Sequence, residues 1–556
     1  MFRTALGETT FQNKYAHAGC ETWPRLCRIL VEDVCGPGVN TKIKEALMSQ
    51  EDIEALIHHM TDFKFMPGGR YLYYAGRRNK FYNNCYLLRA EVDSRQDWAS
   101  LMERSVSCLM SGGGIGTDYS NYRASDMKIT GTGGLASGPI PAMYMTNECG
   151  RNVMQGGSRR SAIYASLKWS HGDVFKFLKS KNWADMKIPG TDVTFAQAKE
   201  NDFNAHAPLD MTNISVNYNT DWLMHYLQTG EVGDVFKENV QQALSTGEPG
   251  FSFNFFEKEN ETLRNACTEV SSEDDSDVCN LGSINLANID SITELKEVVE
   301  LATKFLLCGT LRADLPYQKV EEVRAKNRRL GLGLMGVHEW LLMRGSNYEV
   351  TEELHDWLNV YKRQSDSTSK SFSYELGVSQ PVAVRAIAPT GTIGIVAGTT
   401  TGIEPIYAVA YKRRYLKDGT NWHWQYCIDQ SAKSIIEEYG TDPATIETAN
   451  ELARDYERRI KFQAQVQDYV DMAISSTINL PPWGSKHNNE DTVERFTSIL
   501  AGYAQRIRGF TCYPDAGRGG QPITEVPYLE ALNQEGVEFK EHDICDITNH
   551  GGTCGA

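Results

Sequence analysis

The sequence lacks the features that mark membrane, secreted and repetitive proteins. Its 556 residues contain no run of about 18 apolar residues, so no transmembrane helix is predicted. The first 14 residues have no apolar signal-peptide core, and we expect a cytoplasmic protein with no membrane partner. No internal repeat or low-complexity segment is found. With 41% hydrophobic residues, the chain is long enough to bury a large core.

Positive charge is scarce as well. The chain has 56 Lys and Arg residues against 72 Asp and Glu residues, which gives a formal net charge of −16. A general nucleic-acid-binding protein carries a basic surface, so we expect no DNA partner. Nucleotides are still suitable ligands, because a few local cations and helix N-termini suffice to bind phosphate groups.

The 13 cysteines form no compact disulfide framework. In a reducing cytosol most of them should be thiols, and any disulfide should be transient and catalytic. Most, such as Cys108, Cys308 and Cys427, are expected to act as small buried hydrophobic residues.

One cysteine lies in a distinctive pentapeptide, Asn265-Ala266-Cys267-Thr268-Glu269. In an extended backbone, the two-residue period would place Asn265, Cys267 and Glu269 on one face. A thiol between an amide and a carboxylate forms a compact reaction centre. No second Cys or His lies at a short ligand spacing, so no metal site is expected. The alternative is a cysteine at a loop edge between two solvated neighbours.

Changes in composition and in the pattern of apolar residues divide the chain into three parts. Residues 1–65 are predicted to be a small helical region. From residue 66 to residue 530, short strands, glycine turns and amphipathic helices alternate. Residues 531–556 turn polar, contain Cys545 and Cys554 near their end, and are predicted to be a flexible tail.

Within these parts, apolar spacing predicts several elements. Helices are expected over residues 23–34 and 43–60, and a longer helical region over 442–480. A strand is expected over residues 508–514.

Three glycine-rich segments are candidates for binding phosphate. Residues 130–138 and 155–161 expose backbone N–H groups, and the second segment adds two arginines. The alternative is a pair of mobile surface loops. Residues 386–394 predict a strand, a tight turn and a helix start, whose N–H groups and hydroxyls would bind a phosphate. A plain capped helix is the alternative there.

The order of these motifs resembles the catalytic subunit of ribonucleotide reductases. Asn83-Asn84-Cys85 precedes the pentapeptide, and Val278-Cys279-Asn280-Leu281-Gly282 follows it. Further on, Pro389-Thr390-Gly391-Thr392-Ile393-Gly394 leads into Gly402-Ile403-Glu404-Pro405. The resemblance runs from about residue 68 to residue 522. It implies an α/β fold, a ten-stranded α/β barrel with a central finger loop, preceded by the helical region and by no ATP-cone module.

The resemblance also implies an activity and its residues. In such enzymes a thiyl radical abstracts the 3′-hydrogen, and two further thiols supply the electrons. Cys267 matches the thiyl position on the finger loop, Glu269 the carboxylate that handles the 3′-hydroxyl proton, and Asn265 the amide that holds the substrate hydroxyls. Cys85 and Cys279 match the redox pair. The residues that match the substrate pocket and its phosphate-binding turn are Asn84, Thr390, Gly391, Thr392 and Ile393.

Allosteric control is implied in the same way. The first two glycine-rich segments match the specificity loops, which link an effector nucleotide, a deoxyribonucleotide or ATP, to base choice. The uninterrupted loops resemble those of dimeric members, so a homodimer is expected. The residues that fall at or near effector contacts are Asp93, Arg123, Gly156, Gly157, Ser158 and Arg159.

The tail cysteines Cys545 and Cys554 are candidates for the dithiol that re-reduces the redox pair, although their spacing is wider than in the usual tail motif. Thioredoxin or glutaredoxin is the expected reductant.

The expected radical source is adenosylcobalamin. Members with a ferritin-like partner relay the radical through adjacent tyrosines, but here Tyr513 is followed by Pro514, which cannot relay. The segment Ala516-Gly517-Arg518-Gly519-Gly520-Gln521-Pro522 resembles the cobalamin-dependent members. A glycyl-radical enzyme is disfavoured, because Gly555 lacks the required motif. No short motif identifies the cobalamin site.

Three other interpretations are open to test. The chain could be the large subunit of a two-subunit reductase with an altered relay. It could be a regulatory nucleotide-binding protein that has lost catalysis, although all five catalytic residue types are present. A thiol–disulfide oxidoreductase that uses Cys545 and Cys554 would leave most of the chain unexplained, and the pair lacks the C-x-x-C spacing.

Overall fold

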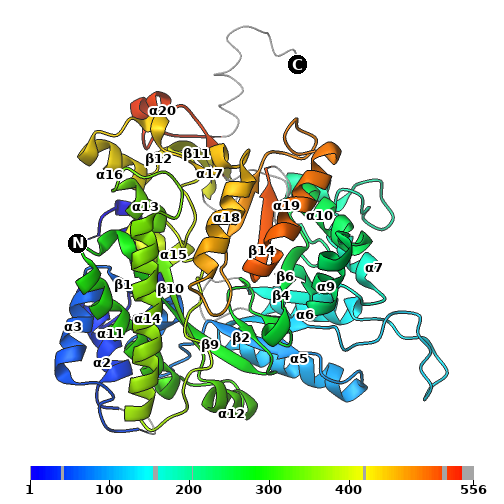
Figure 1. Cartoon of the computed structure of the whole chain (residues 1–556), viewed down its shortest axis with the longest axis horizontal. Helices are drawn as coiled ribbons and strands as arrows, with labels where there is room; N and C mark the ends of the chain where they lie inside the picture. The colour runs from blue at the N-terminus through cyan, green and yellow to red at the C-terminus, as the bar shows by residue number, and fades with distance from the viewer. Residues whose placement is uncertain are drawn as a thin grey trace.

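The computed structural model describes residues 2–38, 43–153, 161–202, 205–417, 421–515 and 523–540. Helices surround a large central sheet (Figure 1). Among the described residues, no helix has both the length and the hydropathy to cross a membrane. The α-helices are α1 (Ala5–Lys14), α2 (Trp23–Cys35), α3 (Gln50–Thr61), α4 (Gly69–Tyr74), α5 (Arg95–Met110), α6 (Ile140–Asn152), α7 (Val174–Leu178), α8 (Phe195–Asn201), α9 (Thr220–Thr229), α10 (Asp234–Thr246), α11 (Ile292–Arg312), α12 (Gln318–Asn327), α13 (Val337–Leu342), α14 (Glu352–Glu375), α15 (Gly391–Ala397), α16 (Gln430–Tyr439), α17 (Ala449–Leu452), α18 (Tyr456–Gln467), α19 (Val493–Tyr503) and α20 (Tyr528–Gln534).

Two sets of parallel strands make up the central sheet. In the first set, β2 to β6 lie side by side in chain order. In the second set, β9 pairs with β10 and β13 pairs with β14, again in parallel. The two sets meet antiparallel, where β2 pairs with β9 and β6 pairs with β14. The strands of the two sets are β2 (Cys85–Arg89), β3 (Gly114–Asp118), β4 (Ile163–Lys168), β5 (Thr212–Tyr218), β6 (Gly250–Phe253), β9 (Asp277–Asn285), β10 (Leu330–Met335), β13 (Thr477–Leu480) and β14 (Gly509–Pro514). The short strand β1 (Phe65–Pro67) pairs antiparallel with β9 and belongs to neither set.

A further extended segment closes this sheet into a barrel. Residues 383–387 bond to β10 through Leu330 N–H to the Ala383 carbonyl at 3.0 Å. On their other side, Ile387 pairs in parallel with Ile474, just before β13. The second set therefore also has five members, and the predicted ten-stranded α/β barrel is confirmed. Closure removes the exposed sheet edges that would otherwise invite association.

Helices cover the outside of the barrel on opposite sides (Figure 1). Helices α2, α3 and α14 pack against α11 on one side, and α10 packs against α19 and β14 on the other. Helix α11 begins after Ser291, whose hydroxyl accepts from Glu294 N–H at 3.2 Å, a side-chain cap of the usual kind. The N-terminal helices share one apolar core with α11 and α14, and the division of the chain at residue 65 is still only a prediction.

Two predicted helices differ from the structure. The helix expected over residues 43–60 begins only at Gln50, after the Ser49 cap. The helical region expected over 442–480 ends at Gln467, and residues 477–480 form β13. Apolar residues 472–474 fit either element by pattern, and barrel pairing decides for extended backbone because their N–H and C=O groups bond across to residues 385 and 387. The strand expected over 508–514 is confirmed as β14.

A finger loop lies inside the barrel. The short strands β7 (Leu263–Arg264) and β8 (Ser271–Ser272) pair antiparallel and carry residues 265–270 between them. Three contacts from different barrel segments hold this loop: the Asn213 side-chain amide donates to the Ala266 carbonyl at 3.1 Å, Ala473 N–H donates to the Glu269 carbonyl at 2.8 Å, and Gly116 lies against Arg264.

Gly116→Ala should destabilise the protein by expelling the finger loop. A Cβ at this position would lie 1.7 Å from the Arg264 carbonyl oxygen, so the two backbones cannot keep their approach. Overpacking of this kind typically costs about 1–3 kcal/mol, and thermal denaturation measures it.

The control is Gly502→Ala in α19, where a Cβ meets nothing within 4 Å. That variant should melt no lower than the wild type, because Ala is favoured over Gly in a helix. If both variants melt alike, the close packing of the finger loop on β3 is wrong.

Candidate active site

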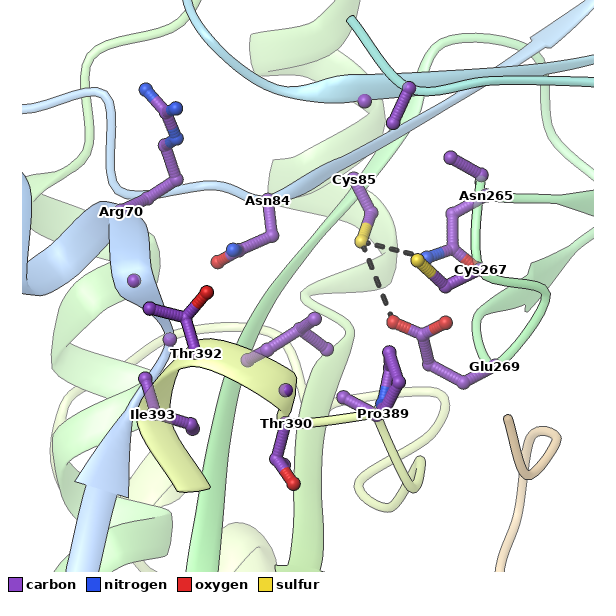
Figure 2. Close-up of a pocket in the computed structure, with 18 of the residues that line it drawn as sticks. Arg70, Asn84, Cys85, Asn265, Cys267, Glu269, Pro389, Thr390, Thr392 and Ile393 are labelled. Carbon is purple, nitrogen blue, oxygen red and sulfur yellow. Dashed lines mark hydrogen bonds between the residues drawn. The ribbon is translucent and has the colours of Figure 1, made fainter. Parts of the chain in front are cut away.

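A pocket of about 130 Å³ opens between the finger loop and the end of the barrel. Its walls come from the start of β2, the finger loop, and the turn that begins α15 (Figure 2). The sequence-predicted residues that line it are Asn84, Cys85, Asn265, Cys267, Glu269, Thr390, Gly391, Thr392 and Ile393.

The finger loop is a turn and does not have the extended backbone that the sequence suggested. Thr268 has a positive φ of 70°, and its N–H donates to the Asn265 carbonyl at 3.0 Å. The Asn265 side-chain carbonyl then accepts from Val270 N–H at 3.0 Å. The two-residue period was therefore the wrong reason for grouping Asn265, Cys267 and Glu269. The folded turn brings all three to the pocket wall instead.

Cys85 is bonded to the finger loop from across the pocket. Its sulfur accepts from the Asn265 amide at 3.0 Å and donates to Glu269 Oε1 at 4.0 Å (Figure 2). Figure 2 also shows Cys267 next to Asn265, on the side of the loop that faces Cys85. Of these thiols, Cys267 is half-buried and Cys85 is buried.

Cys279 is brought against Cys85 by strand register. The two residues are direct Cα partners in the antiparallel pair β2–β9. Cα atoms of such partners lie about 4.5–5.5 Å apart, which is within the range that a disulfide spans. Both cysteines are free thiols, and Cys279 lies behind Cys85 in a small apolar core inside the barrel. Residues far apart in sequence thus form one adjacent thiol pair.

Burial controls the charge state of these groups. Burial first, and then the Glu269 carboxylate, raise the pKa of the Cys85 thiol well above its usual value. Burial and then Asp277 raise the pKa of Cys279 in the same direction. Burial also raises the pKa of the Glu269 carboxyl to about 7. The two thiols are therefore neutral near pH 7, while Glu269 can both hold and release a proton there.

Two polar atoms of residues that line the pocket lack a hydrogen-bond partner in the described chain. Glu269 Oε2 and Asn84 Oδ1 are buried and have no hydrogen-bond partner within the described part of the chain. Buried polar atoms of this kind normally find a partner. Their positions suit a ligand that carries hydroxyl groups.

The turn at Thr390 forms the opposite wall. Thr390 has a positive φ of 51° and precedes α15, so its hydroxyl does not cap that helix. Instead the hydroxyl accepts from Gly402 N–H at 2.8 Å, which ties this turn to the downstream motif. The first N–H groups of α15, from Gly391 onward, have no intrahelical acceptor.

The predicted effector residues lie away from this pocket. Asp93 and Arg123 form an ion pair with each other at a partly exposed site, and Arg123 N–H also donates to Asp93 Oδ2 at 3.2 Å. Gly156, Gly157, Ser158 and Arg159 lie outside the described residues. The tail cysteines Cys545 and Cys554 also lie outside them.

Sequence reasoning missed three polar side chains that line the pocket, those of Tyr15, Arg70 and Ser283. Arg70 is the only cation that lines the pocket within the described chain, and only 5% of it is exposed. Its guanidinium extends away from Cys85 (Figure 2) and lies against Gly112. The pair Gly68-Gly69 before Arg70 was a usable signal of close packing, because a Cβ on Gly68 would lie 2.6 Å from Asn84 Oδ1.

Comparisons with known proteins relate the chain to one family. The family model described as "Ribonucleotide reductase, barrel domain" matches residues 83–376 and 377–513. A vitamin B12-dependent ribonucleoside-diphosphate reductase of Mycobacterium tuberculosis (strain CDC 1551 / Oshkosh) is 27% identical over 86% of this chain and 74% of its own length. A protein of the same name from Thermoplasma acidophilum is 26% identical over 84% of this chain and 65% of its own length. Among solved structures, the Actinobacillus ureae class Id ribonucleotide reductase alpha subunit has a TM-score of 0.69 at 16% identity, over 92% of this chain and 97% of that one.

Glu269→Gln should become more stable relative to the wild type as the pH rises. The folded-state pKa of about 7 lies above the ordinary value of 4.5 for a glutamate, so unfolding releases the proton and wild-type stability falls between about pH 4.5 and 7. The full difference is of order 3 kcal/mol, and the glutamine variant lacks it.

Thermal melts at pH 5 and pH 8 measure the effect. Glu257→Gln, an exposed carboxylate just before the finger, is the matched control. A melting difference between Glu269→Gln and the wild type that stays the same at both pH values, as expected for the control, contradicts the buried-carboxyl assignment.

Proposed function

The chain belongs to the ribonucleotide reductase family, and we propose that it reduces ribonucleotides to 2′-deoxyribonucleotides by thiyl-radical chemistry in the pocket at Cys267. One observation carries the proposal. Cys267, Asn265 and Glu269 lie on one loop that meets Cys85 across a pocket, with Cys279 directly behind Cys85.

Cys267 is the proposed site of the radical. Its thiol is half-buried at the pocket wall, whereas Cys85 and Cys279 are buried. As a thiyl radical it takes the 3′-hydrogen of the ribose, and it receives a hydrogen atom back at the end of the turnover. Glu269 takes up the 3′-hydroxyl proton, which its pKa of about 7 permits. The Asn265 amide orients the substrate hydroxyls.

Cys85 and Cys279 are the proposed electron donors. The ribose loses its 2′-hydroxyl as water, and the two thiols supply two electrons and two protons and become a disulfide. Burial suits this role because it keeps both thiols protonated until they react. Their direct pairing across β2 and β9 lets the disulfide form without a change of strand register.

The turn at Thr390–Ile393 is the proposed phosphate site. It lines the pocket opposite the finger loop, and its backbone N–H groups at the start of α15 have no intrahelical acceptor. Asn84, with its open Oδ1, is the proposed partner for a sugar hydroxyl. A ribonucleotide can then lie with its phosphates on the turn and its ribose at Cys267.

Adenosylcobalamin is the proposed cofactor, as the names of the related enzymes suggest. When bound, it supplies radical chemistry that no side chain supplies alone. Two features of this chain fit it. The half-buried thiol of Cys267 is accessible from the pocket, and Pro514 occupies the place where a relay from a radical-generating subunit needs a second tyrosine. A class I large subunit with an altered relay is the competing proposal.

The proposal also covers allosteric control by an effector nucleotide, the homodimer and the protein reductant. A deoxyribonucleotide or ATP effector binds near Asp93 and Arg123 in a homodimer, and the loop with Gly156 to Arg159 carries its signal to the substrate base. Thioredoxin or glutaredoxin reduces the tail pair Cys545 and Cys554 in the cytoplasm. The three-part division of the chain at residues 65 and 530 belongs to the same proposal.

The first test is an anaerobic assay of CDP and CTP with adenosylcobalamin and dithiothreitol. We expect deoxyribonucleotide formation without any added protein. Activity that appears only with a ferritin-like subunit would decide for the class I interpretation. The absence of product under both conditions would overturn the proposed reaction.

Cys267→Ser should abolish reduction with every reductant. An O–H bond is stronger than the S–H bond that it replaces, so serine cannot carry the radical. Substrate affinity should barely change, because only one atom differs. The measurement is multiple-turnover product formation together with substrate binding. Cys427→Ser, at a half-buried thiol outside the pocket, should keep full activity. Turnover in Cys267→Ser would remove this residue from the radical role.

Arg123→Ala should weaken effector binding and flatten base selection while leaving unstimulated turnover intact. Couplings between allosteric sites are typically about 1–3 kcal/mol, or roughly 5–150-fold in affinity. The measurement is reduction of all four bases with dATP, dTTP or dGTP added. Arg506→Ala is the control, since it removes another partly exposed ion pair. An allosteric response in Arg123→Ala equal to that of the control would make Arg123 a surface ion-pair residue only, worth under about 1 kcal/mol.

A further inference from the structure

A second cavity lies at the other end of the barrel. It encloses about 230 Å³ and is lined by Arg89, Asp118, Lys168 and Asn217, which are at the carboxyl ends of β2, β3, β4 and β5. Cys85 begins β2 and Arg89 ends it, so the cavity and the active-site pocket lie about 13 Å apart along this strand. At about 30 Å³ per water, the space suits a small molecule better than one or two waters. Carboxyl ends of parallel strands are the usual place for ligands in α/β folds.

Two carboxylates line this cavity, and both already have hydrogen-bond partners. Glu259 Oε1 accepts from the Asn219 side-chain amide at 3.4 Å. Asp118 Oδ1 accepts from Ser120 N–H at 3.0 Å, and its Oδ2 accepts from the Thr262 hydroxyl at 2.6 Å. Asp118 therefore links β3 to the chain that leads into the finger loop. Both of its carboxylate oxygens accept hydrogen bonds, so it needs no cation as a partner.

The two cations of the cavity are not satisfied in this way. Lys168 is half-buried, and its ammonium has no ion pair or hydrogen bond within the described residues. Within the part of the chain that the structure describes, the Arg89 guanidinium reaches only the Asn260 carbonyl and the Thr262 hydroxyl, each at the outer limit of 3.5 Å. Its Nε is buried without a partner in the described chain. Both side chains can therefore donate charge-assisted hydrogen bonds to an anion.

The cavity lining also contains one hydrogen-bond acceptor that lacks a donor in the described chain, the side-chain oxygen of Asn217. Asn217 is only 4% exposed, and its amide nitrogen donates to the Ser166 hydroxyl at 3.0 Å. In this orientation of the amide, Asn217 Oδ1 is buried and has no partner among the described residues, while Asn217 itself lines the cavity. A buried acceptor without a donor is costly, so the cavity favours a ligand that brings an O–H group.

We propose that this cavity binds a small anionic molecule that carries a hydroxyl group next to its anion. Lys168 and Arg89 receive the anion, and the ligand hydroxyl donates to Asn217 Oδ1. A phosphosugar and a hydroxy acid share this chemistry. Because Asn260 and Thr262 lead directly into β7 of the finger, the bound molecule also contacts the base of the loop that carries Cys267. The proposal concerns binding alone and does not depend on the reaction proposed for the active-site pocket.

Calorimetric titration of the full chain tests the proposal with ribose 5-phosphate, malate and inorganic phosphate as separate probes. At least one of the two hydroxyl-bearing probes should bind with a Kd near or below about 1 mM, and more tightly than inorganic phosphate. Tighter binding of ribose 5-phosphate identifies a phosphosugar site, and tighter binding of malate a hydroxy-acid site. Equal binding of inorganic phosphate, or no binding of any probe at about 10 mM, overturns the proposal.

Variants locate the bound probe. Lys168→Gln should weaken the binding about tenfold, because it removes one charge-assisted contact. Lys486→Gln, at an exposed lysine outside the cavity, should bind like the wild type. Asn217→Asp keeps the shape of the side chain but places a carboxylate against the anion, and should abolish binding. If Lys168→Gln binds as tightly as Lys486→Gln, the probe lies elsewhere and the cavity is not its site.

Discussion

The close approach of the finger loop to the barrel wall is the constraint on which the site depends. Gly116 leaves room for the Arg264 carbonyl, which a Cβ would meet at 1.7 Å. Buried Arg264 then donates to Asn254 Oδ1 at 2.6 Å and to the Glu261 carbonyl at 2.6 Å, and so ties the loop base to the barrel. The loop is therefore held at its base and, through the Glu269 carbonyl, near its tip, which restricts the positions open to its side chains. A reaction that needs several groups at once benefits from such fixed positions.

The burial that fixes the loop also sets its chemistry. A carboxyl removed from water loses much of its preference for the charged form, and the pKa of Glu269 rises to about 7 as a result. The same burial keeps the thiols of Cys85 and Cys279 protonated. A solvated loop edge, the alternative that the pentapeptide left open, would have given an ordinary carboxylate and exposed thiols. Packing inside a closed barrel therefore distinguishes a reaction centre from an ordinary surface turn.

Much of this arrangement could be predicted from the sequence, for reasons that differ between residues. The barrel followed from the order of distant motifs around Cys85, Cys267 and Thr390, which composition alone would not have given. The backbone of residues 265–269 was predicted wrongly, because the positive φ of Thr268 leaves no signal in a five-residue motif. Residues 472–474 were mistaken for helix because apolar spacing in short runs fits both elements, and only pairing with residues 385–387 decides between them. Arg70 was missed because its place at the pocket depends on packing against Gly112, far away in the sequence.

The direction of the strands explains why the two ends of the barrel differ. The first set of strands runs opposite to the second, so each end of the barrel joins the amino ends of one set to the carboxyl ends of the other. At the active-site end, Cys85 starts β2, while Ser283 lies near the carboxyl end of β9 and Pro389 follows the extended segment 383–387. At the opposite end, the carboxyl ends of β2 to β5 present Arg89, Lys168 and Asn217. The finger loop spans the distance between them, with its base at one cavity and its tip at the other. A single closed sheet thus supports two chemically different cavities, because reversing half of its strands gives each end a set of carboxyl termini of its own.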